Sequence, residues 1–176
     1  MQALAATDGA SLAVRPLEPT DRAALSAGVE RLSAESRYRR FAAPLPRLSE
    51  RDLDRLLDLD HHEREALVAY DPVTGEGLAV ARYAAVPSEC GVAEIALTVM
   101  DAWQSRGVGT GLARLLLERA RVEGVLVLRA SVLADNRRAL AILRRLGFRF
   151  ARRQGVLVEY ALELGGGAVA GDGPCA

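Results

Sequence analysis

The stretch "ALTVMDAWQSRGVGTGLARLLLERA", Ala96–Ala120, decides the fold of this 176-residue chain. Its apolar start predicts a strand that ends in an aromatic and polar turn. Gly107, Gly109 and Gly111 then open an amphipathic helix. Glycines at such a turn let backbone amides approach a ligand, and a helix N-terminus adds free N–H groups. The pattern favours a phosphate or pyrophosphate site, with Arg106 as a further charged contact; a tight turn without a ligand is the alternative.

Two familiar phosphate-binding loops do not fit this turn. A P-loop needs a Gly-Lys-Ser/Thr sequence, and the chain contains no lysine. A dinucleotide-binding fingerprint that starts at Gly107 would need a third glycine at position 112, where the chain has Leu112. The turn therefore belongs to another class of anion site.

Composition narrows the class of protein further. Half of the residues are hydrophobic and 26% are charged, which is typical of a soluble globular domain. Acidic and basic residues balance at 23 each, so no nucleic-acid partner is indicated. The chain has neither a secretory signal nor a membrane-spanning run, and we expect a cytoplasmic location. Cys90 and Cys175 lack metal-ligand spacing and are expected to be free thiols.

The pattern along the chain predicts one mixed α/β domain. Strands are expected at 11–17, 65–71, 76–86, 92–100 and 125–133, with a strand–turn–strand unit at 148–164. Helices are expected at 18–33, 48–60, 107–124 and 135–147, with a short helix or turn at 33–41. We expect residues 1–10 to be a flexible leader, residues 11–164 to be the domain, and residues 165–176 to be a flexible Gly/Ala-rich tail.

Two motifs resemble those of the GCN5-related N-acetyltransferases (GNATs). The turn "QSRGVG", Gln104–Gly109, is similar to their Arg/Gln-x-x-Gly-x-Gly/Ala turn. The later segment "DNRRALAILRRLGF" carries Asn136, Ala139, Gly147 and Phe148 at the family's spacing. Both motifs occur in the family's order, with a predicted strand between them. The resemblance implies the GNAT fold, a mixed and mostly antiparallel central sheet flanked by helices.

The resemblance also implies a cofactor site. GNAT enzymes use acetyl-CoA, whose pyrophosphate would lie on the amides of residues 106–110. Its pantetheine arm would pair with the backbone near Leu97 and Val99 like an added strand, and Asn136 would contact it. The implied site, without any metal, consists of Leu97, Thr98, Val99, Gln104, Ser105, Arg106, Gly107, Val108, Gly109, Thr110 and Asn136.

A narrower resemblance covers nearly the whole domain. Five segments are similar to bacterial protein-lysine acetyltransferases that modify acyl-CoA synthetases: Leu32–Phe41, Leu48–Leu56, Asp60–Ala69, Val80–Tyr83 and Ala93–Gly109. This resemblance implies a protein substrate such as an acyl-CoA synthetase. The alternatives are a small-molecule amine N-acetyltransferase and, in another class, a non-catalytic acyl-CoA sensor.

Acetyl transfer to a lysine amine requires a general base, because this amine has a pKa of ~10.4 and is protonated at neutral pH. Glu94 interrupts an apolar strand and aligns with the proposed base of the resembled enzymes. The alternatives are a solvated Glu94 or a salt bridge to Arg82. The family would supply the oxyanion donor from the backbone near Leu97. Leu143 occupies the place of the family's usual tyrosine acid.

Basic residues before the first predicted hairpin are candidates for substrate binding. Arg37, Arg39 and Arg40 lie in "SRYRRF" and would form a docking surface for an acidic protein patch; an ordinary solvated helix face is the alternative. His61 and His62 are adjacent but have no partner at ligand spacing, which favours a solvated loop over a metal site.

Overall fold

One eight-stranded sheet organises the molecule. The computed structural model describes residues 2–44 and 46–165. The strands are β1 Gln2–Ala5, β2 Ser11–Pro16, β3 Arg64–Tyr70, β4 Gly77–Ala85, β5 Val92–Val99, β6 Val127–Leu133, β7 Arg149–Gln154 and β8 Leu157–Glu163. The helices are α1 Arg22–Arg31, α2 Ala34–Phe41, α3 Glu50–Leu57, α4 Val108–Val122 and α5 Arg137–Arg145, with 3₁₀ turns η1 Pro19–Asp21 and η2 Asp101–Trp103.

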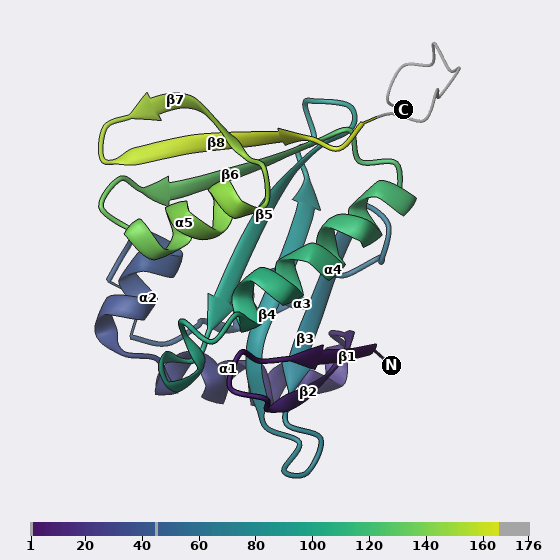
Figure 1. Ribbon diagram of the computed structural model, residues 1–176, viewed down its shortest axis with the longest axis vertical. Helices are drawn as coiled ribbons and strands as arrows, with labels where there is room; N and C mark the ends of the chain where they lie inside the picture. Colours follow the sequence, from purple (N-terminus) through teal and green to yellow (C-terminus); the bar gives the residue numbers. More distant parts are fainter. Residues whose placement is uncertain (1, 45, 166–176) are drawn as a thin grey trace.

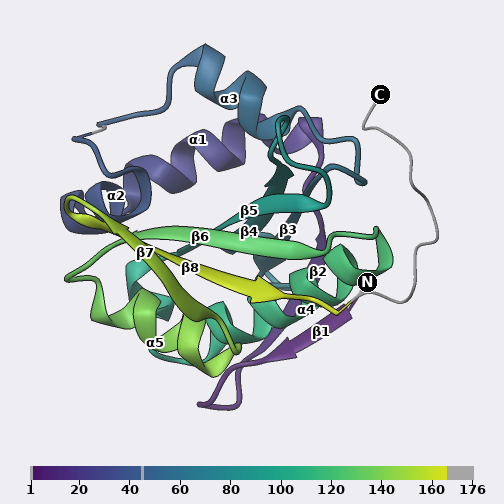
Figure 2. The ribbon, with the colours of Figure 1, turned by 90° about the horizontal axis from the view of Figure 1, so that it is seen from above.

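The helices cover the two faces of the sheet unequally. Helices α1, α2 and α3 lie on one face, and α4 and α5 lie on the other, as the view from above shows (Figure 2). The strand order is β1-β2-β3-β4-β5-β6-β8-β7. All neighbours pair antiparallel except β5 and β6, which pair in parallel through the α4 crossover. The predicted mixed, mostly antiparallel sheet is confirmed.

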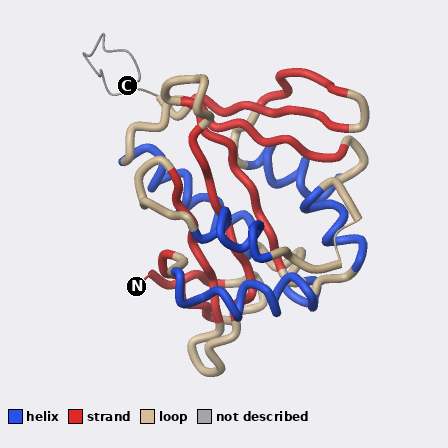
Figure 3. The backbone as a smooth tube through the Cα atoms, turned by 180° about the vertical axis from the view of Figure 1, so that it is seen from behind, coloured by secondary structure: helices blue, strands red, loops and turns tan. Residues whose placement is uncertain are grey.

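The parallel pair is short, and this opens the molecule. Strands β5 and β6 pair only over Val92–Glu94 and Val127–Arg129. Beyond these three pairs the two strands diverge, and α4 and α5 follow on the same face of the sheet (Figures 1 and 3). β6 pairs with β8 along its whole length, and beyond Glu94 the facing edge of β5 has no strand partner among the described residues.

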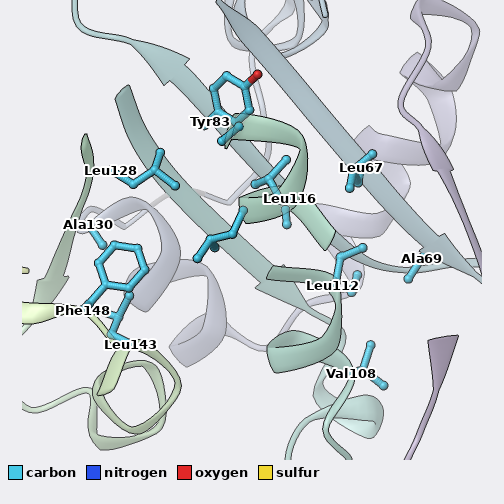
Figure 4. Packing of buried hydrophobic residues seen from close by; sticks show 14 of the residues in the cluster. Leu67, Ala69, Tyr83, Val108, Leu112, Leu116, Leu128, Ala130, Leu143 and Phe148 are labelled. Atoms are coloured by element: carbon cyan, nitrogen blue, oxygen red, sulfur yellow. The ribbon is translucent and has the colours of Figure 1, made fainter. Parts of the chain in front are cut away.

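The core forms where α4 packs on the sheet. Val108, Leu112 and Leu116 repeat every four residues, so they share one face of the helix, and each is fully buried. They meet strand residues such as Tyr83 and Leu128 in one continuous cluster (Figure 4). Burying each leucine stabilises the fold by about 1.5–3 kcal/mol, which anchors the helix whose N-terminus faces the divergent strands.

The predicted flexible leader is wrong. Residues Gln2–Ala5 form strand β1 and pair antiparallel with β2. Leu4 packs on α4 so closely that a Cβ at Gly111 would lie 2.3 Å from its Cδ1. Gly111 therefore makes room for Leu4. A strand of only four residues is too short to show a periodicity that sequence reasoning could detect. The predicted tail lies, beyond residue 165, outside the described residues.

The structure also bears on the expectations about membrane-spanning helices and about the cysteines. Within residues 2–44 and 46–165, the helices are too short or too polar to cross a bilayer. The expected free thiol is wrong for Cys90, which is disulfide-bonded. The spacing of cysteines along a sequence does not reveal which of them the fold brings together. Cys175 lies outside the described residues.

Candidate active site

A cleft of about 460 Å³ lies between the divergent strands β5 and β6. It is walled by both strands, by the turn before α4 and by α5. Most of the predicted cofactor residues line it: Leu97, Thr98, Val99, Gln104, Ser105, Gly107, Gly109, Thr110 and Asn136. The sequence thus located the cleft, although nothing in it showed that β5 and β6 would part at Glu94.

The open edge of β5 suits an extended ligand. No described strand pairs with this edge beyond Glu94. The Val99 carbonyl accepts from Gln104 Nε2 at 3.1 Å, and the other backbone groups of 95–99 that face the cleft have no described strand partner. An arm that carries amide groups can add to such an edge as an extra strand. The geometry fits the pantetheine arm expected from the resemblance.

The turn before α4 presents backbone amides. Ser105 and Gly107 both have positive φ, 63° and 80°, which curves the backbone into a concave nest of N–H groups. Gly107 is the N-cap of α4, and no side chain caps the helix there. The first N–H groups of a helix have no intrahelical partner. This N-terminus therefore fits a pyrophosphate.

Gly109 brings the helix close to the cleft wall. A Cβ at this position would lie 3.1 Å from Leu97 Cδ2 and 3.2 Å from Val99 Cγ2. Contacts this short are rare between real side chains, so any larger residue would push α4 away from β5. The glycine thus sets the distance between the amide-rich turn and the open strand edge.

Two predicted cofactor residues do not line the cleft. The Arg106 guanidinium donates to Asp8 at 3.0 Å and stacks over the Trp103 ring at 4.9 Å from its centroid. Val108 is fully buried beneath the turn. The Arg106 side chain thus contacts the β1–β2 loop rather than the cleft, and its expected contact with the pyrophosphate stays a prediction.

Asn136 has a structural role as well as a place in the cleft wall. It is the N-cap of α5, and its Oδ1 accepts a hydrogen bond from the Ala139 N–H at 3.2 Å. The side chain is largely buried and borders the cleft. Leu143, in the place of the family's tyrosine, is buried and lines the same cleft.

Asp101 joins α2 to the amide-rich turn, and sequence reasoning missed it. Its carboxylate accepts from the Ser33 N–H at 2.8 Å, the Ser33 Oγ at 3.0 Å, the Ser36 Oγ at 2.6 Å and Gln104 Nε2 at 3.3 Å. Burial pushes the pKa of Asp101 upward, but the hydrogen bonds from Ser36 and Ser33 outweigh it and lower the pKa. No local pattern links residues 33 and 101.

Glu94 lies at the apex of the cleft. It is the last residue of β5 that pairs with β6, opposite Arg129. Its side chain is exposed and does not line the cleft, and among the described residues it forms no ion pair with Arg82. By strand alternation it shares a face with Ala96 and Thr98. The exposure matches the solvated alternative, and the position remains suited to a base at the end of the cleft.

The three arginines of α2 separate in space. Arg37 donates to two backbone carbonyls at the end of α1, at 2.8 and 2.9 Å, so it caps that helix. Arg39 pairs with Glu35 one turn away and lines the cleft. Arg40 Nε donates to Thr98 Oγ1 at 3.0 Å. Of the predicted substrate-binding residues, Arg39 and Arg40 reach the cleft and Arg37 does not.

A second, smaller cavity adjoins the cleft. It measures about 100 Å³ and lies between the sheet and helices α1 to α3. Arg40, Ala96 and Thr98 line both cavities. The two cavities therefore meet at the same stretch of β5, one on each side.

The two histidines belong to hydrogen-bonded pairs away from the cleft. His61 Nδ1 lies 2.7 Å from the buried Glu65 carboxylate, and His62 Nδ1 lies 2.8 Å from Glu123. The Glu123 hydrogen bond raises the pKa of His62. Both histidines lie in the loop before β3, as expected, with His62 exposed, and their hydrogen bonds tie this loop to β3 and to the end of α4.

Comparisons with known proteins identify the class. The sequence model of the acetyltransferase (GNAT) domain matches residues 11–149. The chain belongs to the GNAT acetyltransferase family, whose members use acetyl-CoA, and it is an N-acetyltransferase by that membership.

Three relatives place it more closely. Acetyltransferase PA5475 of Pseudomonas aeruginosa is 34% identical over 143 residues, which are 80% of this chain and 76% of that protein. Acetyltransferase Pat of Mycolicibacterium smegmatis is 32% identical over 134 residues, 76% of this chain but only 40% of Pat. The solved GNAT domain of S. lividans PAT superposes with a TM-score of 0.85 at 30% identity, over 92% of this chain and 96% of that domain. The predicted fold and family are confirmed.

Proposed function

We propose that this enzyme transfers an acetyl group from acetyl-CoA to the amine of a protein lysine, such as a lysine of an acyl-CoA synthetase. The observation that carries the proposal is the cleft between β5 and β6, with an open strand edge on one side and an uncapped helix N-terminus at its end. Similarity to Pat of M. smegmatis and to the S. lividans PAT domain supports a protein acceptor.

The chain's own residues have distinct parts in the proposed reaction. The edge of β5 near Leu97 and Val99 holds the pantetheine arm, and the N–H groups at the start of α4 hold the pyrophosphate. Glu94 takes a proton from the acceptor ammonium, directly or through water. The C–N bond then forms at the acetyl carbonyl carbon, the C–S bond breaks and CoA leaves as the thiolate. The nitrogen loses its second proton to water, which gives the neutral amide. A backbone N–H near Leu97 stabilises the developing oxyanion.

The test is acetyl transfer from labelled acetyl-CoA to purified acyl-CoA synthetases and to simple amines. Because the chain contains no lysine, any acetyl-lysine formed belongs to the substrate. Glu94→Gln should lower kcat by roughly 10²–10⁴-fold and leave the Kd for acetyl-CoA unchanged. Full turnover in this variant would exclude Glu94 as the base.

A small-molecule amine is the second candidate acceptor. The 100 Å³ cavity beside the cleft favours it, because a cavity of that size encloses a small group rather than a protein surface. Label on simple amines alone would support this candidate. The cytoplasmic location stays a prediction, and the disulfide at Cys90 removes the free-thiol argument for it.

A further inference from the structure

The smaller cavity has the position of an acceptor site. It lies on the face of the sheet opposite α4, and it shares Arg40, Ala96 and Thr98 with the cleft. An acceptor group held there would reach the stretch of β5 that the cleft exposes from the other side. The rest of the wall is mostly apolar, with contributions from Leu25, Val29, Phe41, Leu56 and Val68.

Arginines on this face differ in whether they have an acidic partner. Arg15 lies in the cavity wall and pairs with Asp21 at 2.7 Å. Arg64, on β3 beside Arg82 of β4, pairs with Asp60 at 2.9 Å. Within residues 2–44 and 46–165, neither Arg40 nor Arg82 pairs with a carboxylate. Both line the cavity.

Arg40 and Arg82 are close neighbours. Arg82 lies opposite Ala96 in the β4–β5 register, and Val80 lies opposite Thr98, so Arg82 and Thr98 are diagonal neighbours on one face. Arg40 reaches the same place from α2 through its Nε hydrogen bond to Thr98. Its terminal Nη groups form no described hydrogen bond.

The two guanidinium groups disturb each other. Burial, and the nearby charge of Arg82, lower the pKa of Arg40 to about 10. Burial, and the charge of Arg64, lower the pKa of Arg82. Two partly buried like charges without a described carboxylate partner destabilise the folded state. An anion that enters the cavity would offset this cost.

Size and geometry select the kind of anion. A guanidinium presents a planar fork of donors that matches a carboxylate or a phosphate. A cavity of about 100 Å³ corresponds to only a few water molecules of about 30 Å³ each. It holds a carboxylate on a short stem and excludes a nucleotide.

We propose that Arg40 and Arg82 bind a carboxylate of the acceptor, so that the preferred acceptor amine has a carboxylate close to it. The inference rests on the proposed transfer to an amine. The carboxylate comes from an acidic residue beside a lysine or from the acceptor's own acid group. The same two charges disfavour an ammonium nearby, so they lower its pKa and increase the fraction of neutral, nucleophilic amine.

The first test measures binding without turnover. Glutarate, a dicarboxylate probe, should bind saturably in a calorimetric or NMR titration. Arg82→Gln should weaken it at least tenfold, and Arg82→Lys should weaken it less. Arg51→Gln is the matched control, because Arg51 is exposed on α3. The Kd for acetyl-CoA should stay unchanged in Arg82→Gln, since Arg82 does not line the cleft. Its melting temperature should hold or rise, because the substitution removes a desolvated charge.

The second test identifies the source of the carboxylate. The kcat/KM is compared for a lysine peptide flanked by Glu against one flanked by Gln, and for 4-aminobutyrate against butylamine. The wild type should prefer the acidic member of one pair by about tenfold, and Arg82→Gln should reduce that preference to near unity. A preference within the peptide pair would mean that the carboxylate comes from an acidic residue beside the lysine. A preference within the small-amine pair would mean that it comes from the acceptor's own acid group.

Three results would overturn the carboxylate subsite. They are absence of saturable glutarate binding, equal binding by wild type and Arg82→Gln, and acidic preference that survives in Arg82→Gln. If no amine is acetylated at all, the proposed function fails, and the glutarate titration still decides the subsite.

Discussion

Asp101 should hold α2 against the amide-rich turn before α4, and Asp101→Ala tests this. Its carboxylate accepts four hydrogen bonds from Ser33, Ser36 and Gln104. A hydrogen bond to a charged group contributes about 1.5–3 kcal/mol when desolvated, and we take about 0.5–1 kcal/mol each because Asp101 is exposed. The loss is then about 3 kcal/mol. A chain of this length should melt about 6–12 °C lower.

The assays separate local from global effects. Urea denaturation gives the free energy of unfolding, and hydrogen exchange reports whether the α2 amides lose protection first. In Asp101→Ala, ordering the turn before α4 again on binding would cost about 1.4 kcal/mol of the binding free energy, so the Kd for acetyl-CoA should rise about tenfold. Asp101→Asn, which keeps one carbonyl acceptor, should fall between wild type and Asp101→Ala.

The pH dependence has a definite sign. Because the folded pKa of Asp101 is lowered, its contribution is present above the unfolded value, near ~3.9, and is lost as pH falls through the folded pKa. The stabilities of wild type and Asp101→Asn should therefore converge in acid. Asp54→Ala, which removes one exposed ion pair with Arg22, is the control and should change stability by less than about 1 kcal/mol. A loss in Asp101→Ala no larger than in this control, with α2 protection unchanged, would refute the reasoning.

Three further substitutions probe the turn and the pairs near α4. Gly107→Ala places a side chain at φ 80°, which should cost about 1–2 kcal/mol by urea denaturation and weaken acetyl-CoA binding; unchanged binding would argue against the amide nest. Glu65→Gln weakens the hydrogen bond, 3.1 Å long, from the half-exposed Arg119 to the buried Glu65 carboxylate and should cost about 1–3 kcal/mol by thermal melting, whereas a neutral result would mean that the pair adds nothing. The bond to Glu123 raises the pKa of His62, so its stabilisation is complete below the unfolded pKa and lost as pH rises through the folded one. His62→Gln should flatten that decline between about pH 6 and 8, and identical pH profiles would contradict the pairing.

Local features of the amino-acid sequence predict most of the secondary structure and the position of the amide-rich turn before α4. Apolar periodicity over Val108–Val122 and the glycines before it are local features, and they act through the backbone of the same few residues. For the same reason the capping-box start at Ser49, with Asp52, was readable from four consecutive residues. The family motifs extended this local reading to the fold and the cleft wall.

Only the tertiary structure decided the contacts between distant segments. Strand β1 gains its order from pairing with β2 and from Leu4 on α4, which its own sequence does not show. Asp101 receives its donors from α2, 65 to 68 residues earlier in the chain. Likewise Arg37 and Arg40 look equivalent in "SRYRRF", but helical rotation directs one to the end of α1 and the other to Thr98 on β5. Such side-chain partners depend on how helices and strands pack, and no pattern within a single segment specifies that packing.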